Sequence, residues 1–479
     1  MPREAPFDAI VVGSGPNGLA AAALLVRAGK RVLLREAHTE VGGGTRTAEL
    51  TLPGFRHDVC SAVHPLGVLS PLFRQLPLAE HGLKWVSPPV CAAHPLPDGP
   101  AALLLPSLGE TAELLGNDGP AYRRLLSPFL RTDPHGLLAD MMGPLRLPKH
   151  PFLMARFGLR GVRPALGLAR GWFEEPRARA LFAGCAAHGI MPFNKLLTGA
   201  VGMLFLLTAH IEPWPVVAGG SQALALALAS YIRANGGVIE TGQPVTSLAE
   251  LPDSRAVLFD LAPKQLVEIA GDALPQGYRR RLARYRYGPA FFKLNWALSE
   301  PIPWRDARCA EASTVHVGGT LEEVAAGELE MWRGGHPGSP FVMITQQSHF
   351  DPSRAPKGRH TGYAYCHVPN GSSVDMTEAI EAQVERYAPG FRDCIMARHV
   401  QSPSDLERYN GAYVGGASTG GVADIFQFFT RPVARLNPYR TPNPRLFLCS
   451  AATPPGGGVH GMCGYHAARS AFPEASLGL

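Results

Sequence analysis

The most constraining feature of the chain is the stretch Phe7–Glu36, FDAIVVGSGPNGLAAAALLVRAGKRVLLRE, which has the pattern of one βαβ unit. Phe7–Val12 is an apolar run with the length of a buried parallel strand. A helix is predicted over Asn17–Ala28, with Gly29 as its C-terminal stop, and Arg31–Glu36 supplies a second strand. The sequence therefore predicts a parallel α/β sheet that includes the first strand.

The turn after this strand carries glycines at the spacing G-x-G-x-x-G: Gly13, Gly15 and Gly18, with Ser14 between the first two. The first glycine permits a tight bend, the second lets a pyrophosphate approach the backbone, and the third lets helix and strand pack closely. Glu36 stands 18 residues after Gly18, at the end of the second strand, where a carboxylate accepts hydrogen bonds from ribose hydroxyls. A glycine-rich turn in an ordinary sheet would leave Glu36 unexplained, so the motif predicts dinucleotide binding.

Composition and cysteine spacing argue against several other classes of protein. The 479 residues are 46% hydrophobic and 18% charged, which describes a globular chain long enough for two domains. The net charge of +6 comes without an aromatic-interleaved RNA motif or a recognition helix, so no nucleic-acid partner is expected. The eight cysteines form no C-x-x-C pair, so neither a metal site nor a redox disulfide is predicted.

Two segments bear on localisation. Met1–Ala5 is charged and runs straight into the first strand, which leaves no room for a signal peptide. The longest apolar run, Leu196–Ala209, is too short and too interrupted to cross a bilayer. We expect a cytoplasmic protein, either soluble or peripheral to a membrane.

Changes in the local pattern of residue types along the chain predict two interleaved domains. Residues 71–215 are rich in proline and in helical patterns. A pattern of alternating helices and strands begins again at Gly219, and Ser221 is the expected cap of the first of these helices. From about Arg286, runs such as Pro289–Leu298 alternate and predict half-exposed strands of an antiparallel sheet. We expect the nucleotide-binding domain to comprise residues 1–70, 216–285 and 441–479, and the substrate domain to comprise residues 71–215 and 286–440.

Two further glycine-rich segments complete the predicted cofactor site. Ala37–Thr47, AHTEVGGGTRT, is a loop rich in backbone N–H donors that ends in a cation. Near the C-terminus, Arg445–Cys449 is a predicted strand, Ser450–Gly458 a loop and His460–Phe472 a helix. Only 18 residues follow Gly461, too few for another nucleotide domain. We therefore expect the amides of this loop to meet the middle or the flavin end of the same cofactor.

Together these segments resemble the phytoene-desaturase and carotenoid-isomerase-like group of FAD-dependent oxidoreductases, within the flavin amine oxidase superfamily. The segments are GSGPNG, the Glu36 position, GGGTRT, GGSQALALALASYIRANGGVIETGQPV and the final TPPGGGVHGMCGYHAARSAF. The C-terminal motif is specific to this group, whereas the substrate domain matches only in its general pattern of residue types. The resemblance implies an α/β fold with a Rossmann-like FAD-binding domain of the GR2 type and a substrate domain of mixed or antiparallel sheet plus helices.

The resemblance also implies which residues hold FAD. The ADP half would be bound by Gly13, Ser14, Gly15, Gly18 and Glu36, the diphosphate and flavin side by Gly43, Gly44 and Arg46, adenine by the backbone of Val245, and the ribityl chain and isoalloxazine by Ala451, Gly458, Val459 and Gly461. Ser450-Ala451 departs from the Gly-Asp of many flavoproteins. The desaturase branch often lacks that Asp too.

In such enzymes the flavin takes the hydride and the protein positions the substrate, so no catalytic triad is expected. The candidate catalytic residues are His460 and Tyr465, which flank the final glycine motif, and Lys293 on an expected strand. His460 is either a proton-relay partner or a loop histidine that holds backbone. Lys293 either reaches N5 through water or is an exposed strand lysine. Cys463 suggests a covalent flavin, but a small buried cysteine is the commoner explanation.

Two regions of the sequence bear on the substrate and its entry. Residues 146–179 hold eight Arg and Lys against two acids, with apolar side chains between the charges. Such a surface suits the headgroup region of a bilayer through which a lipid substrate could enter. The alternative is a helical lid with solvated arginines and an apolar side packed on the core. The residues expected to edge the cavity are His57, Asp58 and His64.

The preferred function is FAD-dependent oxidation (desaturation) of a hydrophobic, polyene-like substrate. A hydride would pass from a C–H bond to N5, followed by reoxidation by oxygen, a quinone or another acceptor. The alternatives are amine or amino-acid oxidation, redox-neutral isomerisation, and a flavoprotein of little turnover that acts through partner binding.

Overall fold

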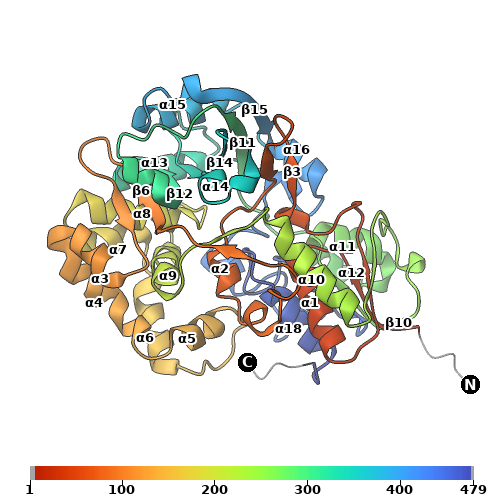
Figure 1. The fold of residues 1–479 in the computed structure, drawn as a ribbon. Helices are drawn as coiled ribbons and strands as arrows, with labels where there is room; N and C mark the ends of the chain where they lie inside the picture. The colour runs from red at the N-terminus through yellow and green to blue at the C-terminus, as the bar shows by residue number, and fades with distance from the viewer. Residues whose placement is uncertain (1–5, 476–479) are drawn as a thin grey trace, which may run out of the picture.

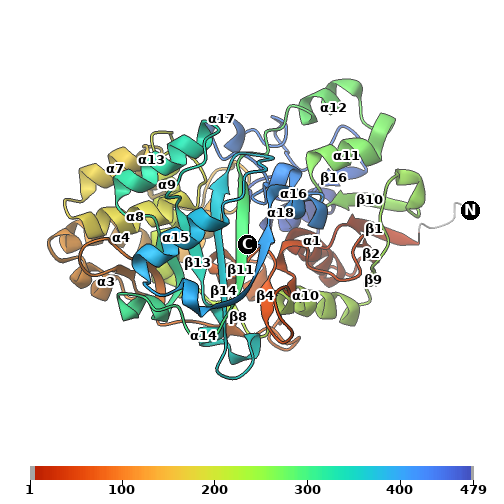
Figure 2. The same ribbon diagram turned by 90° about the horizontal axis from the view of Figure 1, so that it is seen from above.

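The computed structural model describes residues 6–475, in which two β-sheets lie side by side and helices cover them (Figures 1 and 2). The expectation about a signal peptide rests on residues 1–5, which lie outside the described part of the chain. None of the helices in residues 6–475 combines the length and apolar character that crossing a membrane requires.

The smaller main sheet is parallel throughout and has the strand order β16–β10–β1–β2–β9. β1 is its centre, because Val12 pairs with Arg35 of β2 on one side and with Phe259 of β10 on the other. Three separated parts of the chain therefore build this sheet. Its strands are β1 (Phe7–Val12), β2 (Val32–Arg35), β9 (Val238–Glu240), β10 (Ser254–Phe259) and β16 (Leu446–Leu448).

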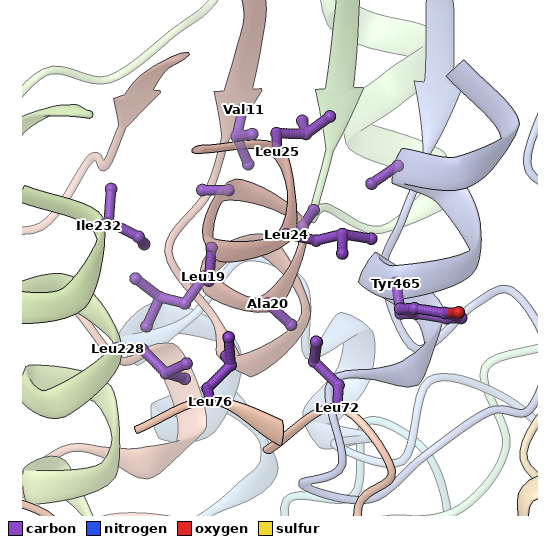
Figure 3. Packing of buried hydrophobic residues seen from close by; sticks show 14 of the residues in the cluster. Val11, Leu19, Ala20, Leu24, Leu25, Leu72, Leu76, Leu228, Ile232 and Tyr465 are labelled. Carbon is purple, nitrogen blue, oxygen red and sulfur yellow. The ribbon is translucent and has the colours of Figure 1, made fainter. Parts of the chain in front are cut away.

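Both faces of the parallel sheet are covered by helices, as two-sided apolar strands require. Alternate residues of β1 enter different cores: Val11 packs with α1, α10 and α18, and Val12 packs with α11 and α12. Figure 3 shows Leu19 of α1 facing Leu228 of α10, with Tyr465 of α18 on the opposite side of α1. The helices are α1 (Pro16–Arg27), α10 (Gln222–Ala234), α11 (Pro263–Ala270), α12 (Gln276–Leu282) and α18 (Met462–Ala471).

The second sheet has seven strands in the order β15–β11–β14–β13–β12–β6–β7. Its neighbours pair antiparallel except β6 and β12, which are parallel. β11 differs from the half-exposed strand expected here, because all nine of its residues are buried. Phe292 and Leu294 enter the core, whereas Phe291 and Lys293 line a cavity. The strands are β6 (Val90–His94), β7 (Ala102–Leu104), β11 (Ala290–Leu298), β12 (Ala312–Val317), β13 (Val342–Thr345), β14 (His360–Val368) and β15 (Ile395–Gln401).

Residues 71–215 are helical for most of their length, but β6 and β7 within them join the seven-stranded sheet. The expectation of a mostly helical insertion therefore missed two of that sheet's strands. Short ladders pair β3 (Thr47–Glu49) with β4 (Arg56–Asp58), and β5 (Trp85–Val86) with β8 (Val216–Val217). After α2 (Pro65–Val68), the helices within residues 71–215 are α3 (Leu108–Leu114), α4 (Gly119–Leu130), α5 (Pro134–Met141), α6 (Pro151–Gly161), α7 (Ala165–Trp172), α8 (Pro176–Ala187) and α9 (Thr198–Ile211).

Further helices cover the other side of the seven-stranded sheet and its ends (Figure 2). α15 packs with the face of the sheet that carries Phe292 and Leu294, because its Ile380 and Val384 belong to the same core. α13 packs with α8 on the helical side. These helices are α13 (Leu321–Trp332), α14 (Gln347–Phe350), α15 (Thr377–Tyr387), α16 (Pro403–Tyr409) and α17 (Ile425–Phe428).

Candidate functional site

A cavity of about 1480 Å³ reaches from the carboxyl edge of the parallel sheet to the seven-stranded sheet. Gly13, Glu36 and Gly458 line it at the first sheet, and Phe291 and Tyr363 line it at the second. A ligand that enters at the G-x-G-x-x-G loop can therefore extend to the face of the larger sheet.

The glycine loop joins β1 to α1 and keeps its backbone open to the cavity. Gly13 has a φ of +96°, and Gly15 is the N-cap residue of α1. Both line the cavity, whereas Gly18 lies behind them, where a Cβ would clash with the carbonyl oxygen of Gly13. The Oδ1 atom of Asn17, in the first turn, is buried without a partner among the described residues. The open backbone of this cradle fits the diphosphate end of a dinucleotide, whose oxygens accept hydrogen bonds from N–H groups at a helix N-terminus.

Glu36 lies at the end of β2 and lines the cavity with 8% of its surface exposed. Its Oε2 accepts the N–H and the hydroxyl of Ser14, at 2.8 and 2.5 Å. Its Oε1 accepts the N–H of His38 at 2.8 Å and pairs with Arg46 at 3.1 Å. The carboxylate therefore ties the glycine loop to the following loop, and a ribose hydroxyl would bind it by taking the place of one present donor, such as the Ser14 hydroxyl.

Asp260 follows β10 and lines the cavity beside the same loop, a position for which the sequence motif gives no signal. Its Oδ2 accepts the N–H of Gly18 at 2.8 Å, and a Cβ at Gly15 would lie 2.5 Å from that oxygen. Burial raises the pKa of Asp260 to about 7, the Gly18 hydrogen bond opposes this, and the charge of Glu36 adds to it. A carboxyl that titrates near neutrality thus stands next to the expected phosphate position.

The GGGTRT loop lies against the glycine loop. A Cβ at Gly43 would lie 3.0 Å from the Cα of Gly15, and one at Gly44 would clash with the hydroxyl of Tyr413. Gly43, Gly44 and Arg46 all line the cavity. Arg46 donates to the carbonyl oxygen of Glu40 at 3.0 Å, so the cation is held by the loop that it ends.

The C-terminal motif contributes part of its length to the cavity. Ala451, Gly458 and Val459 line it, and so does Val245 from the connection before β10. Gly461 is not among the lining residues and has a φ of +69°. A Cβ there would lie 2.7 Å from Ala20 of α1, so this glycine lets α18 begin close to α1.

His460 lines the cavity and is 1% exposed. Its Nδ1 accepts the N–H of Met462 at 3.0 Å, and its carbonyl oxygen accepts the Ser70 hydroxyl at 2.6 Å. Burial lowers its pKa to about 4, so the imidazole is neutral at neutral pH. Of the two roles expected for His460, these contacts match the histidine that holds backbone.

The structure places two neighbours of His460 outside the cavity lining, against the expectation for Tyr465 and in line with the buried cysteine expected at Cys463. Tyr465 belongs to the hydrophobic core between α1 and α18 and is not among the lining residues (Figure 3). Cys463 is also buried away from the lining, with its Sγ 3.5 Å from the carbonyl oxygens of Thr453 and Gly456. Tyr465 is therefore not placed to touch a substrate, and Cys463 is a small buried core residue.

Lys293 lines the cavity but is buried, not an exposed strand lysine. Its Nζ donates to the carbonyl oxygens of Asp58 and Val59, at 2.7 and 2.8 Å, and to Asn295 at 3.0 Å. It also lies 4.2 Å from the ring centre of Tyr363. Burial lowers the pKa of Lys293 to about 7. Three acceptors use the three N–H donors of the ammonium, so this lysine joins β11 to the end of β4 and the residue that follows it.

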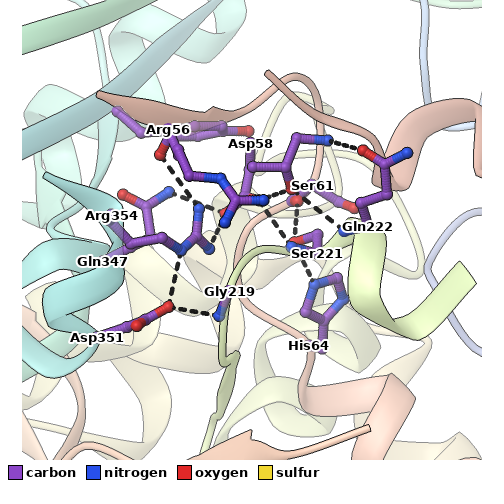
Figure 4. A network of polar contacts seen from close by, with 12 residues as sticks. Arg56, Asp58, Ser61, His64, Gly219, Ser221, Gln222, Gln347, Asp351 and Arg354 are labelled. Carbon is purple, nitrogen blue, oxygen red and sulfur yellow. Dashed lines mark hydrogen bonds and ion pairs between the residues drawn. The ribbon is translucent and has the colours of Figure 1, made fainter. Parts of the chain in front are cut away.

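Asp58 is the centre of a buried polar network (Figure 4). The network links Ser221, which precedes α10, to Arg354, which precedes β14. It pairs with Arg354 at 2.7 Å and accepts the N–H of Ser221 at 2.8 Å. Burial alone would raise its pKa, but Arg354 and the hydrogen bonds outweigh this and lower it. Ser221 does not cap α10 with its side chain as expected; its hydroxyl donates to the Ser61 carbonyl oxygen and contacts His64 Nε2. Of the three residues expected to edge the cavity, the lining includes His64 but not His57 or Asp58.

The wall at the far end of the cavity is largely aromatic and aliphatic. Phe291 lies edge-on to Tyr365 at 4.8 Å, and Tyr365 to Tyr363 at 6.0 Å. These side chains project into the cavity from β11 and β14, whereas one face of the alternating strand at Pro289–Leu298 was expected to be exposed to solvent. The remaining apolar lining of this region includes Ile190, Met191, Phe205, Trp214 and Met343.

Comparisons with known proteins agree with this architecture. A family profile described as "NAD(P)-binding Rossmann-like domain" matches residues 11–76. The chain is 27% identical over 551 residues to "Pyridine nucleotide-disulfide oxidoreductase domain-containing protein 2" of Rattus norvegicus, covering 98% of this chain and 94% of that protein. It is 28% identical over 443 residues to a phytoene dehydrogenase of Streptomyces griseus, covering 86% and 81%.

Solved structures show the same fold. An oxidoreductase from Methanosarcina mazei aligns with a TM-score of 0.65 and 18% identity, over 97% of this chain and 99% of that one. A putrescine oxidase variant aligns with a TM-score of 0.60 and 17% identity, over 98% of both chains. The chain is thus similar over nearly its whole length to oxidoreductases, and its fold is a mixed α/β architecture with a Rossmann-like nucleotide-binding domain, as in the amine oxidases.

Proposed function

We propose that the protein is an FAD-dependent oxidoreductase that removes a hydride from a C–H bond of a hydrophobic small molecule. The observation that carries this proposal is the cavity, which begins at the glycine loop and Glu36 and continues to the aromatic wall of Phe291, Tyr363 and Tyr365. The similarity to a phytoene dehydrogenase supports an apolar substrate.

When bound, FAD would supply the hydride acceptor for this oxidation. The backbone at Gly13 and Gly15 would bind the diphosphate at the N-terminus of α1, and Glu36 would accept a hydrogen bond from a ribose hydroxyl. The aromatic wall orients the substrate and excludes water from the reacting C–H bond. Lys293 supports this wall. Its ammonium packs on the ring of Tyr363 and holds β11 to the end of β4.

The proposal is tested with the absorbance spectrum of the purified protein, followed by anaerobic mixing with apolar alkenes, ketones and amines. Flavin bands that bleach with an apolar compound are the expected result. Bleaching by amines alone would contradict an apolar substrate and indicate an amine substrate instead. A colourless protein that FAD does not reconstitute would contradict the cofactor assignment.

We also propose that the substrate enters from a membrane surface. Residues 141–173 contain six Arg and Lys and no Asp or Glu, and residues 425–473 also contain no acid. Both segments carry exposed apolar side chains and border the cavity: the exposed fractions are 89% at Leu147, 90% at Phe152 and 78% at Phe426. His466 joins the two segments, since its Nε2 lies 3.0 Å from the Met142 carbonyl oxygen and its ring stacks on Tyr439. An apolar, basic rim of this kind is complementary to an anionic bilayer.

Vesicle flotation tests the membrane proposal. Wild-type protein is expected to float with vesicles of phosphatidylcholine and phosphatidylglycerol, and less with phosphatidylcholine alone. The double variant Leu147→Ser/Phe152→Ser should bind at least tenfold more weakly, because two side chains no longer enter the bilayer. Leu226→Ser on α10, which is 51% exposed away from the rim, is the matched control. Equal flotation of the double variant and the control would contradict membrane entry.

A further inference from the structure

Two histidines form part of the cavity wall on its helical side. His188 follows α8 and lines the cavity, and His316 on β12 is fully buried beside it. Their Nε2 atoms are 3.1 Å apart. Phe205 stacks on His188 with 4.0 Å between ring centres and 26° between ring planes, and Trp214 lies edge-on at 5.9 Å. These contacts hold the His188 ring in one orientation.

The surroundings of His316 assign the proton between the two rings. A hydrogen bond between neutral imidazoles needs one N–H donor and one bare nitrogen. His316 Nδ1 is buried and has no partner among the described residues, and a Cβ at Gly184 of α8 would clash with this ring. Because an unpaired buried N–H is rarer than an unpaired acceptor, the proton of His316 belongs on Nε2, which donates to His188 Nε2.

This assignment determines the tautomer of His188. Burial lowers its pKa to about 3, so the ring is neutral at neutral pH and carries one proton. Since Nε2 accepts from His316, that proton is on Nδ1, an atom used by no hydrogen bond within residues 6–475. Ile190 and Met191, which follow His188 in the chain and also line the cavity, carry no oxygen or nitrogen acceptor in their side chains. The cavity wall thus contains an N–H donor without a protein partner in apolar surroundings.

We propose that His188 Nδ1 donates a hydrogen bond to an uncharged oxygen of the substrate, a carbonyl or hydroxyl group on an otherwise apolar molecule. The inference rests on the proposed function only in taking the cavity as the substrate site. An uncharged oxygen suits the pair, because a carboxylate would have to lose its hydration beside two neutral rings. His188 is then a specificity residue, and His316 is a positioning residue that sets its tautomer.

Calorimetric binding of two matched probes to the FAD-reconstituted protein tests this inference. 2-Octanone and 1-octene have the same number of carbons and differ in the carbonyl oxygen. Wild-type protein is expected to prefer 2-octanone, and His188→Phe should reduce that preference about five- to tenfold, because one neutral hydrogen bond is lost. His188→Gln keeps an N–H donor and should retain part of the preference.

A second measurement and a control exclude a general loss of packing. The carbonyl stretch of bound 2-octanone should lie at lower frequency in wild type than in His188→Phe. Phe205→Leu removes the stacked ring but keeps the donor, so it should weaken both probes and leave their ratio unchanged. An equal ratio and frequency in wild type and His188→Phe would overturn the inference, and so would a failure of 2-octanone to bind. These readouts do not use flavin reduction, so the inference can fail while the proposed oxidation stands.

Discussion

At the scale of single residues, the pair Asp58 and Arg354 joins the strand after the glycine loops to the turn before β14, and both side chains have no exposed surface (Figure 4). Removing one partner would leave the other charge buried and unpaired. Asp58→Asn is expected to lower the free energy of unfolding by about 3–5 kcal/mol, measured by chemical denaturation. The exposed pair Arg170 and Glu322, with 52% and 51% of their side chains accessible, supplies the control. Glu322→Gln should cost less than about 1 kcal/mol, and equal losses in both variants would contradict the role of the buried pair.

Asp260 gives a prediction about the pH dependence of cofactor binding. Its pKa of about 7 means that the carboxyl gains a negative charge as the pH rises through neutrality, next to the expected phosphate position. The affinity of the wild-type protein for FAD should therefore fall between pH 6 and pH 8. Asp260→Asn keeps an oxygen for the Gly18 N–H and removes the charge, so its affinity should not change over that range. Asp272→Asn, 96% exposed on the surface, removes the same formal charge and should behave as wild type. A fall of equal size in the Asp260 variant would contradict the prediction.

The sequence revealed those site residues whose role depends on local spacing. Gly13, Gly15 and Glu36 belong to one βαβ unit, so their placement at one edge of the sheet follows from the pattern alone. Asp260 and His188 could not be found in this way, because the parallel pairing of β10 with β1 and the packing of α8 bring them to the cavity from distant positions. Lys293 was recognised as a candidate, but its acceptors Asp58 and Val59 lie more than 230 residues away in sequence.

At the scale of elements, the contact of α1 with α18 depends on a glycine. A Cβ at Gly464 of α18 would clash with the backbone oxygen of Asn17 in α1, so Gly464→Ala should force the helices apart and lower the melting temperature. Gly167 in α7 has open space around its Cα, so Gly167→Ala should stabilise the protein by about 0.5–1 kcal/mol. Thermal unfolding of both variants measures the contrast. A Gly464 variant as stable as wild type would show that the helices can move apart without loss.

Elements were predictable where the sequence carries an apolar run or an alternating pattern beside a clear loop signal, and were missed where it carries neither. β16 was placed within one residue of its ends, because it is an apolar run before a proline- and glycine-rich loop. β7 has only three residues and β6 reads VCAAH, so neither carries the alternation that marks a strand. β11 does alternate, but its polar face meets the cavity and the Lys293 network, so the pattern suggested solvent where the structure has a site.

At the scale of the whole molecule, buried histidines predict sensitivity to acid. Burial lowers the pKa of eight of them below the value of 6.5 found in unfolded chains, so below pH 6.5 the unfolded state binds protons that the folded state does not. Stability is therefore lost as the pH falls from about 6.5 toward 4. The histidines are His57, His64, His94, His188, His210, His316, His460 and His466.

The lowered pKa values of these histidines are large enough to change the stability of the protein in mild acid. A histidine whose pKa falls from 6.5 to about 4 costs about 2 kcal/mol at pH 5, so a few such groups together reach the roughly 5–15 kcal/mol that stabilises a typical domain. Asp260 acts in the opposite direction, since its raised pKa adds stability as the pH falls below 7, but it is one group against eight. We expect urea denaturation to show most of the stability lost between pH 6.5 and pH 5, and a smaller loss in His466→Gln, which keeps a donor for the Met142 carbonyl oxygen. Unchanged stability at pH 5 would mean that these rings reach solvent and bind protons in the folded protein.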